Sequence, residues 1–365
     1  MRAAPIHVLH VVPGLIAGGM ELGMARVIRG LSDRGLEHSV ACLKGEPEIS
    51  DHLPEKTRIY CLRSRPNEPQ LPARLATLIR RIRPTVIHAR NWGAWPDVAV
   101  GRFLAPPIVP LIFSFHGLEE AGYIPLRRRL ASRVLVRITT RLFTLSEESK
   151  RMLVTHWGWP AKRGDVIPNG VDTNRFRPAP APSDTDRFVV GTVGNLRPVK
   201  NQALLIRACA QVARAGVDVE LRIAGEGAER DNLLTLARSL GFADRLLLFA
   251  RIQDVPGFLN QLHLFVLSSN SEQHPNALNE AMACGLASVA TRVGCVQELL
   301  DDGRCSRIVP PGDEEAMAQA IGELAADHGA RDDLGKKARH RVCEVYSLQR
   351  MLAAYERLYR ETSRT

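Results

Sequence analysis

Two carboxylates stand eight positions apart in the stretch SEQHPNALNE, which covers residues 271–280. Glu272 follows an apolar run that predicts a strand at 264–270, and Glu280 lies in the opening turns of a helix predicted over 276–284. A carboxylate accepts hydrogen bonds from paired hydroxyl groups, and the loop after a parallel strand is a common ligand site. The spacing alone also fits two surface acids on a helix. The surrounding strand, loop and small-residue helix AMACG favour a site.

A cation and an imidazole also follow predicted strands. Lys200 lies in NLRPVKN, just after a strand predicted at 187–195, and Arg197 precedes it by three positions. His116 ends the apolar run PLIFSFHG and is followed by a glycine. A lone histidine is more often structural, and Arg197 equally fits a solvated turn. The place of His116 at a strand end favours function.

Short apolar strands alternate with longer helical patterns in both halves of the chain. This alternation predicts parallel, doubly wound sheets of the Rossmann-like α/β class, with ligands at the carboxyl ends of the strands. The predicted strands are 6–12, 38–43, 84–89, 110–117 and 142–146, and then 187–195, 219–227, 245–250 and 264–270; the predicted helices include 21–35, 200–214 and 228–240.

A segment rich in proline and alanine, 175–187, is typical of a linker between the two halves. The sequence therefore predicts a domain over 1–180, a second over 181–346, and a final helix within 347–365 that packs back toward the first domain. The two domains are expected to face each other across a cleft, which is the default binding site.

The composition excludes several classes of protein. No apolar run reaches 18 residues, so no transmembrane helix is expected, and the apolar N-terminus is interpreted as a first strand rather than a signal peptide. The seven cysteines are scattered without a CxxC pair, which favours a reducing, cytoplasmic setting over a disulfide framework or a zinc site.

The positive charge is concentrated in the first half. Residues 1–180 hold 27 Lys and Arg against 15 Asp and Glu, whereas the whole chain has a net charge of +10. The segment 126–142 carries six arginines and no acid, and its arginines and aliphatic residues form neighbouring stripes at helical spacing. This helix, from Arg127 to Arg141, predicts either peripheral contact with an anionic membrane or a solvated helix face. Aromatic residues are not interleaved, so nucleic acid is discounted.

Six motifs occur in the order found in one enzyme family: AGGMELGMARV, FSFHG, VIPNGVDTNRF, GTVGNLRPVKN, SEQHPNALNEAMACG and IVPPGD. With these six motifs in this order, the chain resembles the retaining family 4 glycosyltransferases of the GT-B type, which have two Rossmann-like domains. The first half looks like bacterial sugar transferases of polysaccharide assembly. The resemblance implies transfer of a sugar from a nucleotide diphosphate sugar, UDP- or GDP-linked, to an acceptor hydroxyl of a sugar or lipid-linked molecule.

The resemblance also assigns roles to single residues. Lys200 matches the lysine at the donor diphosphate, and Glu272 and Glu280 match the E-x7-E pair that binds the donor-sugar and ribose hydroxyls. His116 matches the histidine that reaches the donor sugar and gives it hydrogen bonding or positive charge. The backbone amides of 275–278 would lie beside the diphosphate. The other implied donor-site residues are Gly18, Gly19, Asn195, Arg197, Ile252, Gln273, His274, Pro275, Asn276, Ala277 and Leu278.

No metal or other cofactor is expected from the resemblance. Cations and helix N-termini would stabilise the leaving diphosphate. The triplet DTD at 184–186 imitates a metal-binding motif, but it lies in the linker and is rejected.

Several positions depart from the family pattern. Asn195 stands where many relatives have arginine, and Gln273 and His274 replace a glycine and an apolar residue. Cys295 stands where a second glycine is expected. We expect Gln273 and His274 to influence the choice of donor sugar. Two other functions stay open: a GT-B nucleotide-sugar epimerase or hydrolase, and a nucleotide-sugar-binding protein without catalysis.

Overall fold

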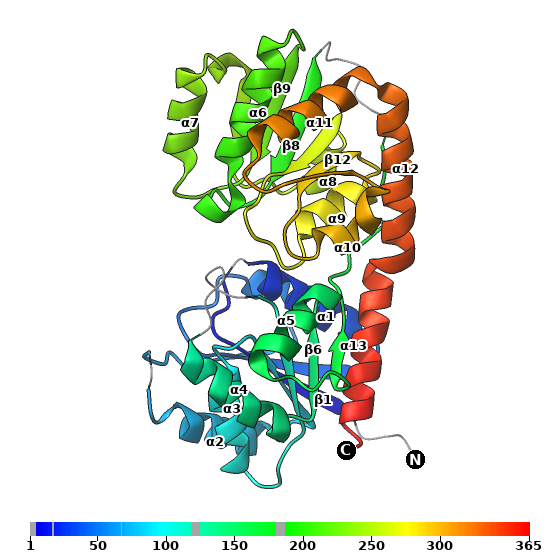
Figure 1. The fold of residues 1–365 in the computed structure, drawn as a ribbon. Helices are drawn as coiled ribbons and strands as arrows, with labels where there is room; N and C mark the ends of the chain where they lie inside the picture. The colour runs from blue at the N-terminus through cyan, green and yellow to red at the C-terminus, as the bar shows by residue number, and fades with distance from the viewer. Residues whose placement is uncertain (1–4, 17, 67, 118–124, 180–186) are drawn as a thin grey trace. The chain divides into compact units, whose positions relative to one another are not determined.

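The computed structural model describes residues 5–16, 18–66, 68–117, 125–179 and 187–365, and it is drawn in Figure 1. The chain divides into two compact units. Unit 1 comprises Met1–Asn169 with Met351–Thr365, and unit 2 comprises Gly170–Arg350. The predicted boundary at residue 180 and the triplet at 184–186 lie outside the described residues. Among the helices that are described, none is long and apolar enough to cross a bilayer.

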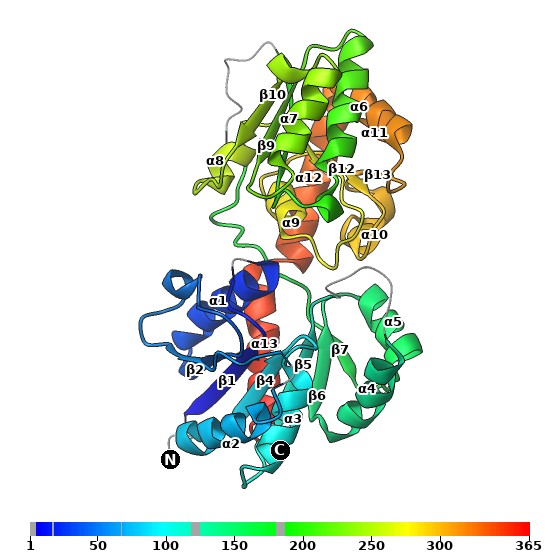
Figure 2. The same ribbon diagram turned by 90° about the vertical axis from the view of Figure 1, so that its left-hand side faces the viewer.

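Unit 1 contains a parallel sheet whose described strands lie in the order β3-β2-β1-β4-β5-β6-β7. Its strands are β1 (Ile6–Val12), β2 (Leu36–Cys42), β3 (Arg58–Cys61), β4 (Val86–Arg90), β5 (Leu111–Phe115), β6 (Arg141–Thr144) and β7 (Gly164–Val166). Its helices are α1 (Gly19–Ser32), α2 (Leu71–Ile82), α3 (Trp95–Phe103), α4 (Leu126–Ile138), α5 (Glu147–Trp157) and most of α13 (Leu348–Thr362). Figure 2 draws α2 and α3 in front of this sheet and α13 behind it.

The two faces of the unit 1 sheet differ in chemistry because side chains alternate along a strand. Leu9, Ile87 and Phe113 point to the face that α2 and α3 cover, where they form an apolar core with Trp95. Several of the intervening residues are polar: His10 on β1 pairs in register with His88 on β4, and Arg90 pairs with Ser114 on β5. All four of these polar side chains are buried. The face beneath α13 is therefore polar although it is closed to solvent.

Unit 2 contains a second parallel sheet, with its described strands in the order β10-β9-β8-β11-β12-β13. Its strands are β8 (Phe188–Val193), β9 (Val219–Ala224), β10 (Leu246–Phe249), β11 (Leu264–Leu267), β12 (Ser288–Thr291) and β13 (Arg307–Val309). Its helices are α6 (Gln202–Arg214), α7 (Arg230–Ser239), α8 (Val255–Leu259), α9 (Asn276–Ala283), α10 (Val296–Leu299), α11 (Glu314–Ala326) and α12 (His328–Val345). Short 3-10 turns occur in unit 2 at η2 (Pro198–Lys200), η3 (Ala243–Arg245) and η4 (Asp301–Gly303), and in unit 1 at η1 (Ser50–His52).

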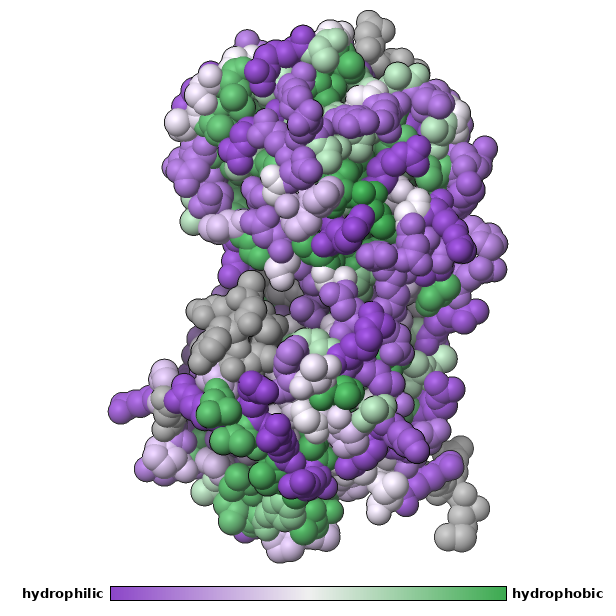
Figure 3. Space-filling view, viewed as in Figure 1, coloured by the Kyte–Doolittle hydropathy of each residue, from purple (hydrophilic) through white to green (hydrophobic). Residues whose placement is uncertain are grey.

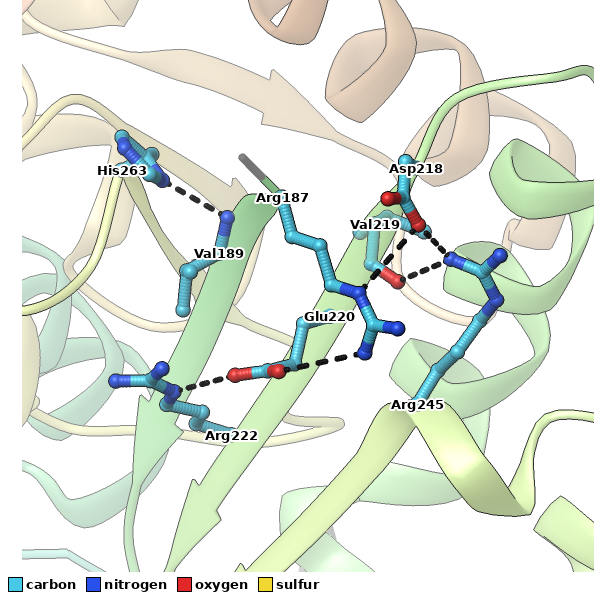
Figure 4. A network of polar contacts seen from close by, with 8 residues as sticks. All are labelled: Arg187, Val189, Asp218, Val219, Glu220, Arg222, Arg245 and His263. Atoms are coloured by element: carbon cyan, nitrogen blue, oxygen red, sulfur yellow. Dashed lines mark hydrogen bonds and ion pairs between the residues drawn. The ribbon is translucent and has the colours of Figure 1, made fainter. Parts of the chain in front are cut away.

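The amino end of the unit 2 sheet carries an ion-pair network, shown in Figure 4. Glu220 on β9 accepts from Arg222 at 2.7 Å and lies 3.7 Å from Arg187, which precedes β8. Asp218, just before β9, contacts both Arg187 and Arg245. These residues tie the starts of three strands together, at the end of the sheet opposite to the loops described below.

The predicted fold class is confirmed, since both units are parallel-sheet, Rossmann-like α/β structures. Several elements were predicted too long: the strand expected over 110–117, for example, is Leu111–Phe115. The basic helix expected over 126–142 ends at Ile138, and Arg141 is instead the first residue of β6. Arg141 lies 3.4 Å from Glu361 of α13, so it does not belong to the arginine stripe of the helix.

Candidate functional site

The order of strands in unit 2 reverses at β8, which has β9 on one side and β11 on the other. In an open parallel sheet, such a reversal leaves room for a ligand between the loops at the carboxyl ends of the two strands. The loop after β8 carries Lys200, and the loop after β11 carries Glu272. The topology therefore brings together two residues that lie 72 positions apart.

Lys200 and Glu272 form a close ion pair. The Lys200 ammonium donates to Glu272 Oε1 at 2.5 Å, and the Ser269 hydroxyl donates to the same oxygen at 2.7 Å. The Glu272 side chain is 9% exposed and that of Lys200 31%. Within the described part of the chain, both contacts fall on Oε1, so Oε2 is the oxygen that remains for a ligand.

The backbones of the two loops are also joined. The Ser268 hydroxyl donates to the Lys200 carbonyl at 3.0 Å, and the Asn270 amide donates to the Val199 carbonyl at 2.8 Å. Asn201 takes a left-handed conformation at φ 46° and caps α6 by accepting from Leu204 at 3.3 Å. These contacts fix the backbone of the turn that carries Lys200, so its ammonium group is held in position before any ligand binds.

A third loop supports the Glu272 backbone. Gly294, after β12, has φ 51°, and a Cβ placed on it would lie 1.7 Å from the Glu272 carbonyl oxygen. The buried Thr291 hydroxyl donates to the Ser269 carbonyl at 2.6 Å. Gly294 is needed because no side chain fits between the two backbones. The neighbouring Cys295 is buried in the core and precedes α10.

Helix α9 begins directly after the loop that carries Glu272, with Pro275 at its N-cap. Pro275 carries no N–H, so the expectation of free amides at 275–278 is corrected to Asn276, Ala277 and Leu278. These donors and the helix dipole make the start of α9 favourable for an anion. Glu280 lies one turn further on and is 9% exposed. Burial raises the pKa of the Cys284 thiol to about 12, and the negative charge of Glu280 acts in the same direction.

The far end of α9 is held by α12. A Cβ on Gly335 would lie 2.1 Å from the Gly285 carbonyl, so the helices meet at a glycine. Arg339 of α12 donates to the carbonyls of Ala283 at 2.6 Å and Phe176 at 2.7 Å. The last carbonyl of α9, that of Ala283, is therefore satisfied by a cation, which also suits the helix dipole.

Gln273 and His274 occupy different environments. The His274 side chain is 7% exposed, lies with its ring centroid 5.5 Å from that of Tyr346, and its Nδ1 is 3.3 Å from the Asn279 amide. Burial lowers the pKa of His274 to about 4. An amide donates to Nδ1, so His274 is neutral and packs inside unit 2. Gln273 is half-buried. Of the two predicted determinants of sugar choice, only Gln273 keeps an accessible side chain.

Asn195 and Arg197 are exposed in the loop after β8. A neighbouring loop, after β9, lies directly against this loop. A Cβ on Gly225 would lie 2.0 Å from the Gly194 carbonyl, and one on Gly227 would lie 2.2 Å from the Leu196 carbonyl. Leu196 also donates to Glu226 at 2.8 Å. Two glycines thus hold the backbone from which Asn195 and Arg197 project.

Ile252 lies between β10 and α8 and is half-buried against the apolar core of unit 2. Asp254 caps α8 by accepting from the Gly257 amide at 3.0 Å. This loop also follows the carboxyl end of a strand, two strands away from β8.

In unit 1, His116 directly follows β5. Its Nε2 lies 2.8 Å from the Ser114 hydroxyl and 3.5 Å from Arg90, and its amide donates to Asn91 Oδ1 at 2.9 Å. Burial and the Arg90 charge hold the pKa of His116 well below its usual range. His116 is therefore neutral near pH 7.

Gly18 is the N-cap of α1, and Gly19 is its first residue. A Cβ on Gly18 would lie 2.5 Å from the Glu21 carboxylate, which folds back over the helix start. Burial raises the pKa of Glu21, while Arg90 acts in the opposite direction. The resemblance implied that Gly18 and Gly19 belong to the donor site, and the structure places the Glu21 carboxylate of the chain beside Gly18.

Sequence reasoning missed the glycines 225, 227 and 294, and the polar residues beneath α13. The signal for the glycines was their place after predicted strands. The signal for the polar residues was polar side chains at alternate positions in two runs that otherwise read as buried, VIHAR and IFSFH, together with His10 in IHVLHVV. Within the described residues, no group of three His, Cys, Asp or Glu side chains is arranged to hold a metal ion. All seven cysteines are free thiols.

Curated proteins with known activities resemble this chain. An N-acetyl-alpha-D-glucosaminyl L-malate synthase from Bacillus anthracis is 29% identical over 50% of this chain and 47% of its own length. A D-inositol 3-phosphate glycosyltransferase from Kribbella flavida is 27% identical over 88% of this chain and 86% of its own length. The chain thus spans about half of the first relative and most of the second.

A solved structure of Anabaena HepE in complex with UDP-glucose shares the fold, with a TM-score of 0.82, 21% identity, and coverage of 98% of this chain and 100% of that one. Two family models match successive parts of the sequence: Glycosyltransferase Family 4 over 17–175 and Glycosyl transferases group 1 over 174–341. Together they span both units, and the chain belongs to the family 4 glycosyltransferases of the GT-B type.

Proposed function

We propose that this glycosyltransferase moves a sugar from a UDP- or GDP-sugar to an acceptor hydroxyl with retention of anomeric configuration, in the assembly of a cell-surface polysaccharide or glycolipid. The observation that carries the proposal is the Lys200–Glu272 pair at the reversal point of the unit 2 sheet, beside the start of α9. This arrangement offers a cation and helix amides for a diphosphate, and a carboxylate for hydroxyl groups.

The leaving nucleotide diphosphate gains negative charge as the sugar bond breaks, and an enzyme accelerates the step by stabilising that charge. Lys200 supplies an ammonium that is already aimed, and Asn276, Ala277 and Leu278 supply backbone donors. Arg197 and Asn195 add a cation and an amide from the same exposed loop. We propose that these groups act without a metal ion.

The two carboxylates have separate tasks in the proposed mechanism. Glu272 uses Oε2 for hydroxyls of the donor sugar, since Oε1 already receives Lys200 and Ser269. Glu280 binds the ribose hydroxyls of the nucleotide, and Ile252 lines the base. Gln273 contacts the sugar, and His274 with Pro275 positions the start of α9.

From unit 1, we propose that His116 donates a hydrogen bond in the reaction and that Gly18 and Gly19 contribute backbone on the acceptor side. A neutral His116 cannot supply positive charge, so of the two roles that the sequence left open, hydrogen bonding is favoured.

The test is to incubate the protein with a panel of UDP- and GDP-sugars and to measure free nucleotide and product. Acceptors include inositol 3-phosphate, malate and a lipid extract, and each assay is repeated with a chelator. Nucleotide release that depends on an acceptor, continues with the chelator, and gives the donor's anomeric configuration supports the proposal. A new nucleotide sugar indicates an epimerase, release without acceptor a hydrolase, and binding without release a non-catalytic protein.

Lys200→Ala tests the site itself. We expect the transfer rate to fall about a hundredfold or more, because a preorganised group that stabilises charge in the transition state contributes on this scale. Lys337→Ala is the matched control, since Lys337 pairs with Asp333 at the same 2.5 Å distance on the exposed face of α12. Equal activity of the two variants would overturn the assignment.

For the acceptor, we propose that α4 brings the enzyme to an anionic membrane surface. Leu126, Leu130 and Val134 are 64%, 52% and 57% exposed, so the aliphatic stripe faces outward. The exposed arginines Arg127, Arg133 and Arg137 lie on the same helix face. An outward face that mixes aliphatic and cationic side chains is suited to an interface with anionic lipids.

The adjacent end of α3 enlarges this surface. Phe103 and Leu104 are 45% and 46% exposed, and Ile108 in the following loop is 53% exposed. The buried Arg102 joins this end of α3 to α4 by donating to the Ile138 carbonyl. Hydrophobic side chains gather at the foot of unit 1 in Figure 3.

Vesicle co-sedimentation tests the membrane proposal. Changing Arg127, Arg133 and Arg137 to Gln should weaken binding to phosphatidylglycerol-containing vesicles by about 3 kcal/mol, or roughly a hundredfold, at about 1 kcal/mol per charge. Changing the exposed unit 2 arginines Arg214, Arg238 and Arg350 to Gln removes the same charge and should have little effect. Equal loss in both variants, or no binding by the parent protein, would reject α4 as the contact.

A further inference from the structure

A chain of polar side chains inside unit 1 connects α13 to His116. The Tyr359 hydroxyl of α13 lies 2.9 Å from His88 Nδ1, and His88 Nε2 lies 2.8 Å from the Ser114 hydroxyl. The Ser114 hydroxyl in turn lies 2.8 Å from His116 Nε2. Tyr359, His88 and Ser114 are each fully buried. The chain therefore begins in the core and ends at the residue that follows β5.

Such a chain can run in either direction. In one direction Tyr359 donates to His88, His88 donates through Nε2 to Ser114, and Ser114 donates to His116 Nε2. In the other direction, His116 donates through Nε2 to Ser114, Ser114 donates to His88 Nε2, and His88 donates through Nδ1 to Tyr359. The two directions leave His116 with its proton on different nitrogens, so they give it opposite roles toward a ligand at Nδ1.

Arg90 distinguishes the two directions. Its guanidinium is 1% exposed and lies 3.5 Å from His116 Nε2 and 3.4 Å from His10 Nδ1. A guanidinium only donates hydrogen bonds, so both ring nitrogens that face it must accept. Among the described residues, no carboxylate lies within ion-pair distance of Arg90. The cation therefore acts on its imidazole neighbours without a paired anion.

The same polarity continues on both sides of Arg90. His10 must carry its proton on Nε2, from which it donates to His38 Nδ1 at 3.0 Å. Toward α13, burial raises the pKa of Tyr359, so its hydroxyl keeps a proton that it can donate to His88 Nδ1 at 2.9 Å. Each contact around Arg90 thus favours the direction in which protons point toward His116 Nε2.

We propose that Arg90, together with Ser114, His88 and Tyr359, holds His116 as the neutral tautomer whose proton is on Nδ1. Arg90, Ser114, His88 and Tyr359 are positioning residues in this scheme. His116 then presents an N–H donor to an oxygen of the substrate and does not serve as a general base through Nδ1. The substrate oxygen rests on the proposed function, but the position of the proton is a property of the ligand-free protein.

Nitrogen-15 NMR of histidine-labelled, ligand-free protein tests the tautomer directly. His116, assigned by comparison with His116→Gln, should show a protonated Nδ1 and an unprotonated Nε2. A protonated Nε2 or a doubly protonated ring at neutral pH would overturn the proposal. If the expected pattern is found while no nucleotide sugar is turned over, the proposed function fails and the tautomer inference stands.

Variants of the chain test its parts. Tyr359→Phe and Ser114→Ala should each lower kcat about fivefold with little change in the donor KM, since one net hydrogen bond is worth about 1 kcal/mol, and should shift the His116 nitrogen signals toward a mixture of tautomers. Tyr355→Phe is the matched control, because Tyr355 is on the same helix with its ring 5.7 Å from the Arg90 guanidinium. Unchanged nitrogen signals in Tyr359→Phe and Ser114→Ala, or an equal shift in Tyr355→Phe, would reject the chain.

Arg90 itself is tested with two substitutions. Arg90→Lys keeps a cation that only donates and should keep the proton of His116 on Nδ1. Arg90→Met should lose this preference, as seen in the same spectra, if circular dichroism shows that it folds. A folded Arg90→Met with an unchanged spectrum would reject the role of Arg90. If Arg90→Met does not fold, Arg90→Lys decides the question. A shift of the His116 nitrogen signals in Arg90→Lys would reject the role of Arg90.

Discussion

At the scale of single residues, the position of Glu272 depends on a glycine that takes no part in the chemistry. Gly294 has φ 51°, and its missing side chain leaves room for the Glu272 carbonyl. We expect Gly294→Ala to displace the Glu272 loop, lower the transfer rate at least tenfold, and reduce the free energy of unfolding by more than the 1–3 kcal/mol or so of left-handed strain.

Gly241→Ala separates strain from crowding in this prediction. Gly241 has φ 66°, and nothing lies within 4 Å of the position that a Cβ would take. It should show the cost of strain alone, measured by urea unfolding, and leave the transfer rate unchanged. Equal effects of the two substitutions on both stability and activity would show that Gly294 does not position Glu272.

Candidate residues were identified from the sequence by their type and by their position after predicted strands. These criteria were sufficient where the side chain projects directly from the loop after the strand. Lys200 and Glu272 could be predicted to lie near each other, since both follow neighbouring strands of a doubly wound sheet. The burial of His274 against Tyr346 could not be predicted, because it depends on a residue 72 positions away, at the C-cap of a helix whose docking no local pattern specifies. Arg90 was missed because an arginine inside a buried strand gives no local sign of its neighbours.

At the scale of elements, α13 packs closely against α1 at a glycine of α1. A Cβ on Gly30 of α1 would lie 2.4 Å from a Leu352 methyl carbon of α13, so the leucine fills the space above the glycine. We expect Gly30→Ala to cost about 1–3 kcal/mol by overpacking and Leu352→Ala about 2–5 kcal/mol by leaving a cavity. In the double variant the alanine of α1 occupies part of the cavity.

The double variant should therefore be less destabilised than the sum of the two single variants, by about 1 kcal/mol or more in denaturant unfolding. Additive effects would contradict the packing of α13 on α1. This helix also carries Tyr359, so its docking places the first member of the chain that ends at His116.

The types of the predicted elements followed from the periodicity of the sequence, whereas the ends of several elements did not. The helical spacing of arginines and aliphatic residues continued through Arg141, yet α4 ends at Ile138. The Thr139 and Thr140 backbone turns away into β6, and the buried Thr139 hydroxyl accepts from Trp95 at 2.9 Å. A tertiary contact from α3 thus ends a pattern that could have continued locally.

At the scale of the whole molecule, the two units differ in what they bury. Both sheets were predictable, because alternating strands and helices with continuous apolar runs require parallel sheets covered on both faces. The polar core of unit 1 was not, since its histidines lie on separate strands and meet only when the sheet forms. In unit 1, folding lowers the pKa of His10, His38, His88 and His116, and that of His38 to about 3.

This difference predicts that acid destabilises unit 1 more than unit 2. A histidine whose pKa falls on folding binds fewer protons in the native state, so its contribution to stability is full above about pH 6.5 and is lost as the pH falls below that value. Each such histidine then costs up to about 1.4 kcal/mol per pH unit. Glu21 and Asp97, whose pKa values are raised, act in the opposite direction, but they are two groups against four, and unit 2 contains two histidines with a lowered pKa, His263 and His274.

The tryptophans allow the units to be measured separately, because all four of them, Trp92, Trp95, Trp157 and Trp159, belong to unit 1. Between pH 7.5 and 5.5, the urea midpoint seen by tryptophan fluorescence should fall by more than the later part of the transition seen by circular dichroism. His38→Gln should reduce the acid sensitivity of the fluorescence transition, whereas His340→Gln should not, since the His340 side chain is 73% exposed. Fluorescence and dichroism curves that move together with pH would contradict the argument, because the buried histidines would then not set the acid stability of unit 1.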